Sequence, residues 1–358
     1  MRGSTWVRIG LSAASLTLAA TLVVFLPDLV HALTGKSVSW EQIGHAFGGI
    51  GLPMAGLMTA VWLASLIAYT FVLTASLPGL THLQALTLNA SGSAVSNLLP
   101  FGGAVGVAMT FAMTRSWGFR ARPVVVSTVV TGVWNTLFRF LLPAVGILAL
   151  LLAGKSADPT IAKAGWAGAG SILVLVAVAA AALGWQRAAD ALGGLLDRLT
   201  RLLPTRVRPR EHAASEALHR LRADTSEVVR GRWAGLSLGL LAFMAFQWLI
   251  LLCCMRATGV HVGLAESVAA FALSRVLTTA VVTPSGVGIM EAGTAGFLIA
   301  LGSPVPEATA AALLFGFWTY TVEIPFGGLA LGAWALLRRR KGESPADPTP
   351  ETQKIARW

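Results

Sequence analysis

Charged side chains are scarce in this chain of 358 residues, in which Asp, Glu, Lys and Arg together make up 12%. Soluble globular domains carry about twice that share, about 25%. Hydrophobic residues make up 55% of the chain, and the mean hydropathy is +0.71. This balance excludes an ordinary soluble cytosolic enzyme.

Reactive and metal-binding side chains are also few. The only two cysteines, Cys253 and Cys254, are adjacent in an apolar run and cannot make a disulfide framework. The six histidines are scattered without the spacing of zinc ligands. The sequence also contains no nucleophile elbow and no Walker loop. We therefore expect no catalytic residue, no metal and no cofactor.

Long hydrophobic runs are what the chain has instead. A helix needs about 20 apolar residues to cross a bilayer core of about 30 Å, and six runs reach that length: 7–33, 52–76, 124–153, 165–185, 233–255 and 308–337. The first run resembles a secretory signal, but its apolar stretch is longer than in such signals, so we interpret it as a retained anchor. The sequence predicts an all-α polytopic membrane protein with about six full spans.

Two further apolar stretches, about 81–114 and 264–301, are interrupted near the middle. The interruptions are LLPFGG at 98–103 and TPSGVG at 283–288. Proline removes a backbone donor and glycine weakens a helix, so each stretch should form two short arms around non-helical backbone. Such backbone needs protein or a wet cavity around it at membrane depth. Each stretch is predicted to be a re-entrant hairpin or a pair of short spanning helices.

Positive charges are distributed unevenly along this predicted topology. With the N-terminus inside, 21 Lys and Arg side chains fall on the cytoplasmic side and 4 outside. The opposite orientation would invert this bias, which membrane proteins do not favour. We therefore expect a multi-pass protein of the cytoplasmic (inner) membrane with both termini cytoplasmic.

The predicted organisation has four parts. Residues 1–185 form the first membrane half, 186–232 a cytoplasmic amphipathic connector, 233–341 the second membrane half, and 342–358 a disordered cytoplasmic tail. The connector is rich in Arg, which favours contact with anionic lipids of the inner leaflet. It lacks aromatic residues and known nucleic-acid motifs, so we expect no nucleic acid as a partner.

An internal repeat relates the two membrane halves. An offset of 184 residues pairs Pro100 with Pro284, and further matched pairs are Gly102 with Gly286, Gly132 with Gly316 and Trp134 with Trp318. By the charge bias, the first interrupted stretch starts from the cytoplasm and the second from outside. The halves are therefore predicted to be an inverted repeat, the arrangement that secondary transporters use for alternating access.

Four ionisable residues fall inside the predicted spans or arms: Arg139, Arg275, Glu291 and Glu323. A charge at mid-membrane costs about 3 kcal/mol on insertion scales, so each needs a partner or a wet cavity. Arg139 and Glu323 are equivalent at the repeat offset and are predicted to pair, either as a structural salt bridge or around a substrate.

A phosphate-binding site is predicted at the second interruption. Arg275 and Glu291 flank it, and its backbone precedes a helix N-terminus, which suits an anion. Around it we place the backbone of Pro284, Ser285, Gly286 and Gly288, and from the first half Asn97, Pro100 and Gly102. Asn135 shares a helix face with Arg139 and is expected to bind a ligand or, more readily, to make an interhelical hydrogen bond.

Two motifs carry a resemblance to a known family. The stretch PSGVGIMEA at 284–292 is similar to a Pro-x-Gly-Gly-x-Gly-x-Arg-Glu pattern of the lysylphosphatidylglycerol synthase transmembrane family, the flippase-like domain. Val287 and Met290 stand in place of the family's usual Gly and Arg. The stretch NLLPFGG at 97–103 resembles the family's Asn-x-x-Pro-x-x-Gly-Glu region, with Ala104 in place of the acidic residue.

The resemblance implies a polytopic membrane protein that handles polar lipids, with substrates that differ among relatives. We expect no aminoacyl transferase domain, because the tail after Lys341 is too short to hold one. The predicted function is translocation of a polar, phosphate-bearing and thus anionic membrane lipid across the cytoplasmic membrane. Two alternatives stay open: a membrane-bound transferase acting on a lipid-linked substrate, and a non-catalytic scaffold for envelope assembly.

Overall fold

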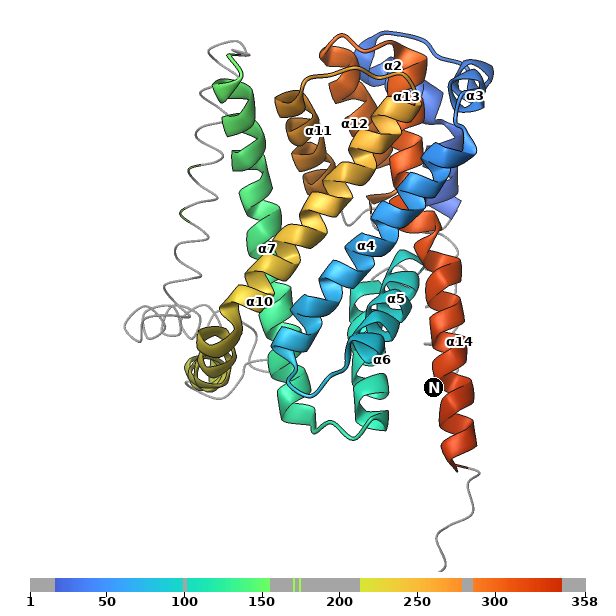
Figure 1. Cartoon of the computed structure of the whole chain (residues 1–358). Coiled ribbons are helices and arrows are strands. Elements are labelled where there is room, and N and C mark those ends of the chain that lie inside the picture. The colour runs from blue at the N-terminus through green and yellow to red at the C-terminus, as the bar shows by residue number, and fades with distance from the viewer. Residues whose placement is uncertain are drawn as a thin grey trace, which may run out of the picture.

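The computed structural model describes residues 17–98, 102–154, 170, 174, 213–278 and 286–342. Within these ranges all regular elements are helices, as the sequence predicts (Figure 1). Four helical segments are long and apolar enough to cross a membrane: 52–76, 121–152, 231–257 and 305–338. They confirm four of the six predicted spans, and the predicted span at 165–185 lies outside the described residues.

These spans are formed by the longest helices of the bundle. They are α4 (Leu52–Ser76), α7 (Ala121–Leu152), the second part of α10 (Ala213–Ala257), and α13 (Val305–Gly316) continued by the π-helix η2 (Phe317–Thr321) and α14 (Glu323–Gly342). α4 and α10 pack along each other, and their buried apolar side chains form much of the main core.

The first predicted span is bent rather than straight. A helix over 17–24 and α2 (Leu26–Thr34) meet at 61°. Pro27 lies in the first turn of α2, where its missing N–H is tolerated but the preceding helix cannot continue through it. After α2 the chain forms α3 (Trp40–Gly48), which begins with a capping box between Ser39 and Gln42.

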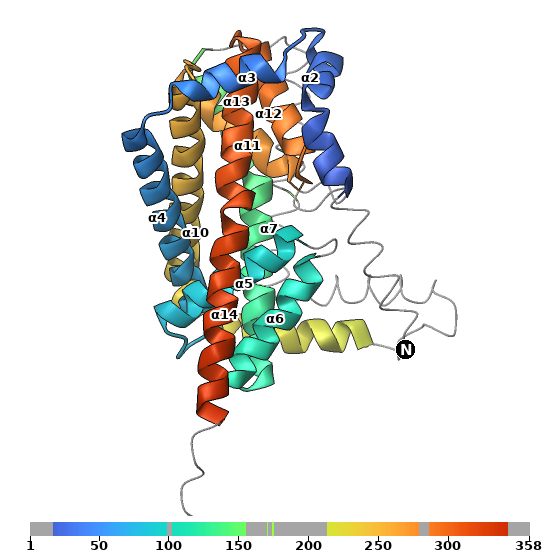
Figure 2. The same cartoon turned by 90° about the vertical axis from the view of Figure 1, so that its right-hand side faces the viewer.

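Each interrupted stretch forms two short helices. The first gives α5 (His82–Leu98) and α6 (Gly102–Ser116), and the second gives α11 (Leu264–Leu277) and α12 (Ile289–Ala300). At about 1.5 Å per residue, α6, α11 and α12 fall short of a bilayer core of about 30 Å. The α5–α6 pair occupies one half of the bundle and the α11–α12 pair the other half (Figures 1 and 2). This arrangement fits re-entrant hairpins that enter from opposite faces.

The connector between the halves is helical where the structure describes it. The helix α10 is interrupted at Arg232, whose φ of −139° is not helical. The part of α10 before this kink runs across the end of the bundle rather than along it (Figure 2). The predicted amphipathic segment before residue 213 lies outside the described residues.

The hairpins pack on the opposite membrane half. The arm α5 contacts α14, and the arm α11 contacts α7. At the offset of 184 residues, α5 corresponds to α11, and α7 corresponds to α13 with α14. The two contacts are therefore exchanged by the predicted symmetry, although the inverted repeat itself stays a prediction.

Glycine permits both of these helix crossings. A Cβ atom on Gly327 of α14 would overlap the backbone of Ala90 and the Cβ atom of Ala94 on α5. A Cβ atom on Gly146 of α7 would lie 3.0 Å from the Cβ atom of Ala272 on α11. Small residues let helices approach closely in membranes, where packing drives association.

We predict that Gly327→Val destabilises the protein, because the added side chain forces α14 away from α5. Overpacking of this kind costs about 1–3 kcal/mol. The measurement is the thermal unfolding midpoint in detergent. The matched control is Gly328→Val, since a Cβ atom on Gly328 meets no atom within 4 Å. Equal midpoints for the two variants would contradict the proposed contact.

Candidate functional site

Arg275 lies in the last turn of α11 and is only 7% exposed. Its guanidinium carbon lies 5.4 Å from the ring centre of Phe271 and 5.0 Å from that of Phe315. These cation–π contacts stabilise a charge in a desolvated place. Among the described residues, however, its Nε and Nη2 atoms have no hydrogen-bond partner. The site therefore presents unused, charged N–H donors.

Glu291 follows the second interruption, in the first turn of α12, and is 4% exposed. Its carboxylate accepts a hydrogen bond of 2.6 Å from the backbone N–H of Gly288, and it contacts Gly316 of α13. Arg275 interacts electrostatically with Arg139, Glu291 and Glu323. The structure thus brings all four ionisable residues singled out in the sequence within electrostatic range of Arg275.

Glu323 occupies the first turn of α14, directly after the π-helix. Its carboxylate accepts a hydrogen bond of 3.2 Å from the side-chain amide of Asn97 on α5 and interacts with Ser93 of the same helix. Within the described helices, Glu323 therefore does not pair with Arg139 as predicted, and Arg139 lies exposed on α7. The reason is geometric, since α14 packs on α5 and places the carboxylate against that arm.

Aromatic side chains surround the charged residues. Tyr320 of the π-helix interacts electrostatically with Arg275, and the Trp62 and Trp318 ring centres are 6.3 Å apart. The hydroxyl of Tyr320 and the Nε1 atoms of both tryptophans are buried without a hydrogen-bond partner in the described part of the chain. A π-helix places backbone and side chains irregularly and is frequent at functional sites.

The glycines of the second interruption have backbone roles. Gly286 and Gly288 adopt φ values of +74° and +87°, which residues with a Cβ atom rarely adopt. A Cβ atom on Gly286 would lie 2.8 Å from the carbonyl oxygen of Leu277. Gly102 begins α6. The predicted site residues Pro100, Pro284 and Ser285 lie outside the described residues.

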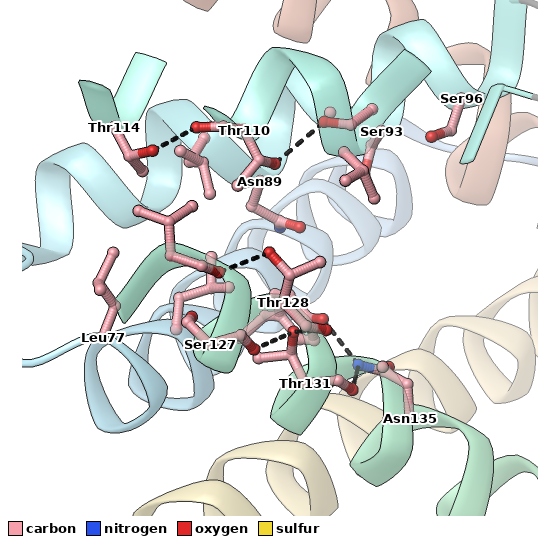
Figure 3. Close-up of a pocket in the computed structure, with 18 of the residues that line it drawn as sticks. Leu77, Asn89, Ser93, Ser96, Thr110, Thr114, Ser127, Thr128, Thr131 and Asn135 are labelled. Atoms are coloured by element: carbon pink, nitrogen blue, oxygen red, sulfur yellow. Dashed lines mark hydrogen bonds between the residues drawn. The ribbon is translucent and has the colours of Figure 1, made fainter. Parts of the chain in front are cut away.

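A polar cavity of about 270 Å³ adjoins this charged site. It lies between α4, α5, α6 and α7 and extends from Leu77 near one end of the bundle to Ser96 (Figure 3). Its polar lining residues are all uncharged: Tyr69, Asn89, Ser93, Ser96, Thr110, Thr114, Ser127, Thr128, Thr131 and Asn135.

Asn135 links the cavity wall to α4. Its Nδ2 atom donates to the hydroxyl of Tyr69 and to the carbonyl oxygen of Thr131, both at 2.8 Å. Asn135 therefore makes the interhelical hydrogen bond that the sequence favoured. Among the described residues, no group of three or more His, Cys, Asp or Glu is placed to hold a metal ion.

Sequence reasoning missed the rings around Arg275 and most of the cavity wall. One signal was available: the chain has only two tyrosines, and Tyr69 and Tyr320 both lie at the site. Phe271 and Phe315 carried no such signal, because phenylalanine occurs 15 times in the chain. Only their packing on Arg275 distinguishes them.

We predict that Arg275→Met leaves thermal stability unchanged or raises it. Methionine keeps the apolar contact with Phe271 and Phe315 and removes a desolvated charge; replacing buried ionic groups by apolar ones is often neutral or stabilising by about 1–4 kcal/mol. Unfolding midpoints in detergent measure this. A midpoint far below that of the unmodified protein would indicate that Arg275 holds the fold together.

Comparison with protein-family models gives one match, to the lysylphosphatidylglycerol synthase TM region, over residues 7–327. No curated protein matches the chain. The matched range includes α2 to α13, both hairpins and the start of α14, and so contains every charged residue of the site. By this match over most of its length, the chain belongs to the lysylphosphatidylglycerol synthase transmembrane family.

Proposed function

We propose that this protein translocates a polar, phosphate-bearing lipid across the cytoplasmic membrane. The observation that carries the proposal is Arg275, a buried cation at the end of the first arm of the second hairpin, with unused N–H donors among the described residues. Leaving such donors unpaired costs free energy, and a phosphate oxygen is the acceptor that a guanidinium binds best. Membership of a lipid-related membrane family supports the same conclusion.

A difference between the two membrane halves supports alternating access. In the second half, Glu291 of α12 contacts Gly316 of α13. The equivalent residues in the first half, at the offset of 184, are Val107 of α6 and Gly132 of α7. Both line the polar cavity, and a Cβ atom on Gly132 would meet nothing within 4 Å. The first half is thus open where the second is closed.

We place the open half on the cytoplasmic side, because the bias of positive charge places both termini and the base of the α5–α6 hairpin there. In this orientation the basic connector meets the anionic lipids of the inner leaflet. A lipid head group then enters from the cytoplasm through the cavity and meets Arg275 near the middle of the membrane.

The orientation predicts the side from which single cysteines react. In a background with Cys253 and Cys254 replaced, we expect Val107→Cys to react with a membrane-impermeant maleimide from the cytoplasmic side. His261→Cys, on the exposed α10–α11 loop, should react from outside. The measurement is labelling of right-side-out and inverted vesicles. A reversed pattern would overturn the orientation.

The translocation assay uses liposomes that contain the purified protein and phosphatidylglycerol with a fluorescent acyl chain. We expect the protein to move this lipid between leaflets, measured by dithionite bleaching, and Arg275→Met to slow the movement about tenfold or more, since a charged hydrogen bond is lost. Arg256→Met is the control, because Arg256 is exposed at the end of α10.

The outcomes separate the candidate functions. Absence of lipid movement with the unmodified protein contradicts translocation and favours a scaffold. Equal protein-dependent movement of a fluorescent galactosyl diacylglycerol, which has a polar head group without phosphate, contradicts the role of Arg275 as the phosphate site.

A further inference from the structure

The polar cavity differs from the charged site beside it, because the described residues that line it include no Asp, Glu, Lys, Arg or His. Asn89 and Thr110 lie on one side of the cavity, and Thr128 and Thr131 lie on the other (Figure 3). Amide and hydroxyl groups therefore face one another across a space without a full charge. A charged group that left water for this space would have no counter-ion in the wall.

The threonine hydroxyls present acceptors to the cavity. Thr110, Thr128 and Thr131 each donate their hydrogen to the carbonyl oxygen four residues earlier in the same helix, at 2.8–3.0 Å. Thr114 does the same at 2.6 Å. A hydroxyl has one donor and two acceptor lone pairs, so these oxygens keep acceptor capacity. The cavity is thus suited to a ligand that supplies several hydrogen-bond donors.

The cavity also reaches the charged site. Ser93 and Ser96 of α5 line the cavity, and Asn97 of the same helix donates a hydrogen bond of 3.2 Å to Glu323, which interacts electrostatically with Arg275. The carboxylate of Glu323 is already engaged by Asn97. A ligand with its phosphate at Arg275 therefore has neutral acceptors, rather than a free carboxylate, within the adjoining cavity.

We infer that this cavity binds the uncharged, hydroxyl-bearing head group of the translocated lipid, such as glycerol or a single sugar. The inference rests on the proposed function and names the substrate class of that same site. Hydroxyl groups donate the hydrogen bonds that the threonine oxygens can accept. Moving a hydroxyl group out of water also costs less free energy than moving a charged ammonium group. A volume of about 270 Å³ lies just below the range of about 300–1,000 Å³ typical of pockets for drug-sized ligands. The cavity thus suits one small group.

Binding of three lipids to the purified protein in detergent tests the inference. All three carry the same acyl chains: phosphatidylglycerol has a hydroxyl-bearing head group, phosphatidylmethanol has the same single negative charge without the hydroxyls, and phosphatidylethanolamine has an ammonium group. We expect phosphatidylglycerol to bind at least about fivefold more tightly than either of the others, as two or more added hydrogen bonds imply.

The double substitution Thr128→Val and Thr131→Val keeps side-chain shape and removes two acceptors. We expect it to abolish the preference for phosphatidylglycerol over phosphatidylmethanol and to leave phosphatidylmethanol binding unchanged. Thr136→Val is the matched control: Thr136 lies on the same helix, donates its hydroxyl hydrogen to the carbonyl oxygen of Gly132 at 2.8 Å and is exposed outside the cavity.

Two results would overturn the inference. The first is binding of phosphatidylethanolamine as tight as, or tighter than, binding of phosphatidylglycerol. The second is an equal loss of affinity for all three lipids in the double variant, which would indicate a structural role for the two threonines. These results are distinct from failure of the proposed function. Selective binding without movement in liposomes refutes translocation alone, whereas movement without head-group preference refutes only the role of the cavity.

Discussion

The burial of one guanidinium group constrains the centre of this protein. Arg275 is held between two phenylalanine rings, and Glu291 and Glu323 act on it through space rather than covering its N–H groups. A charge in this position is expensive, so every helix around it must supply compensation. The aromatic faces do so from α11 and α13, and carboxylates do so from α12 and α14. The unpaired donors are what remains for an anionic ligand.

Short hairpin arms place these groups inside the helix bundle. The arms α11 and α12 are too short to cross a bilayer, and each ends near the interrupted backbone that carries the charged residues. The arm α11 packs closely on α7 of the first half at Gly146, and the arm α5 packs closely on α14 of the second half at Gly327. Because such contacts depend on small residues rather than on apolar burial alone, they fix the arms without blocking the centre.

The site divides into a charged part and a neutral part with different chemistry. The charged part, around Arg275, is closed on the side of α12, where Glu291 fits against Gly316. The neutral part is open between α6 and α7. A lipid head group has the same division, with a phosphate next to a polar substituent. This correspondence is the basis of our proposal that the two parts bind one lipid head group.

By itself the sequence determined which segments are membrane helices, where they break and which charges lie among them, since these follow from local composition. Pro27 and the Ser39–Gln42 capping box also carried the signals for the bend before α2 and for α3. Only the tertiary structure decided that Glu323 bonds Asn97, 226 positions away, that two phenylalanines enclose Arg275, and that the cavity opens in one half. Such pairings depend on how helices cross, and no local pattern specifies that geometry.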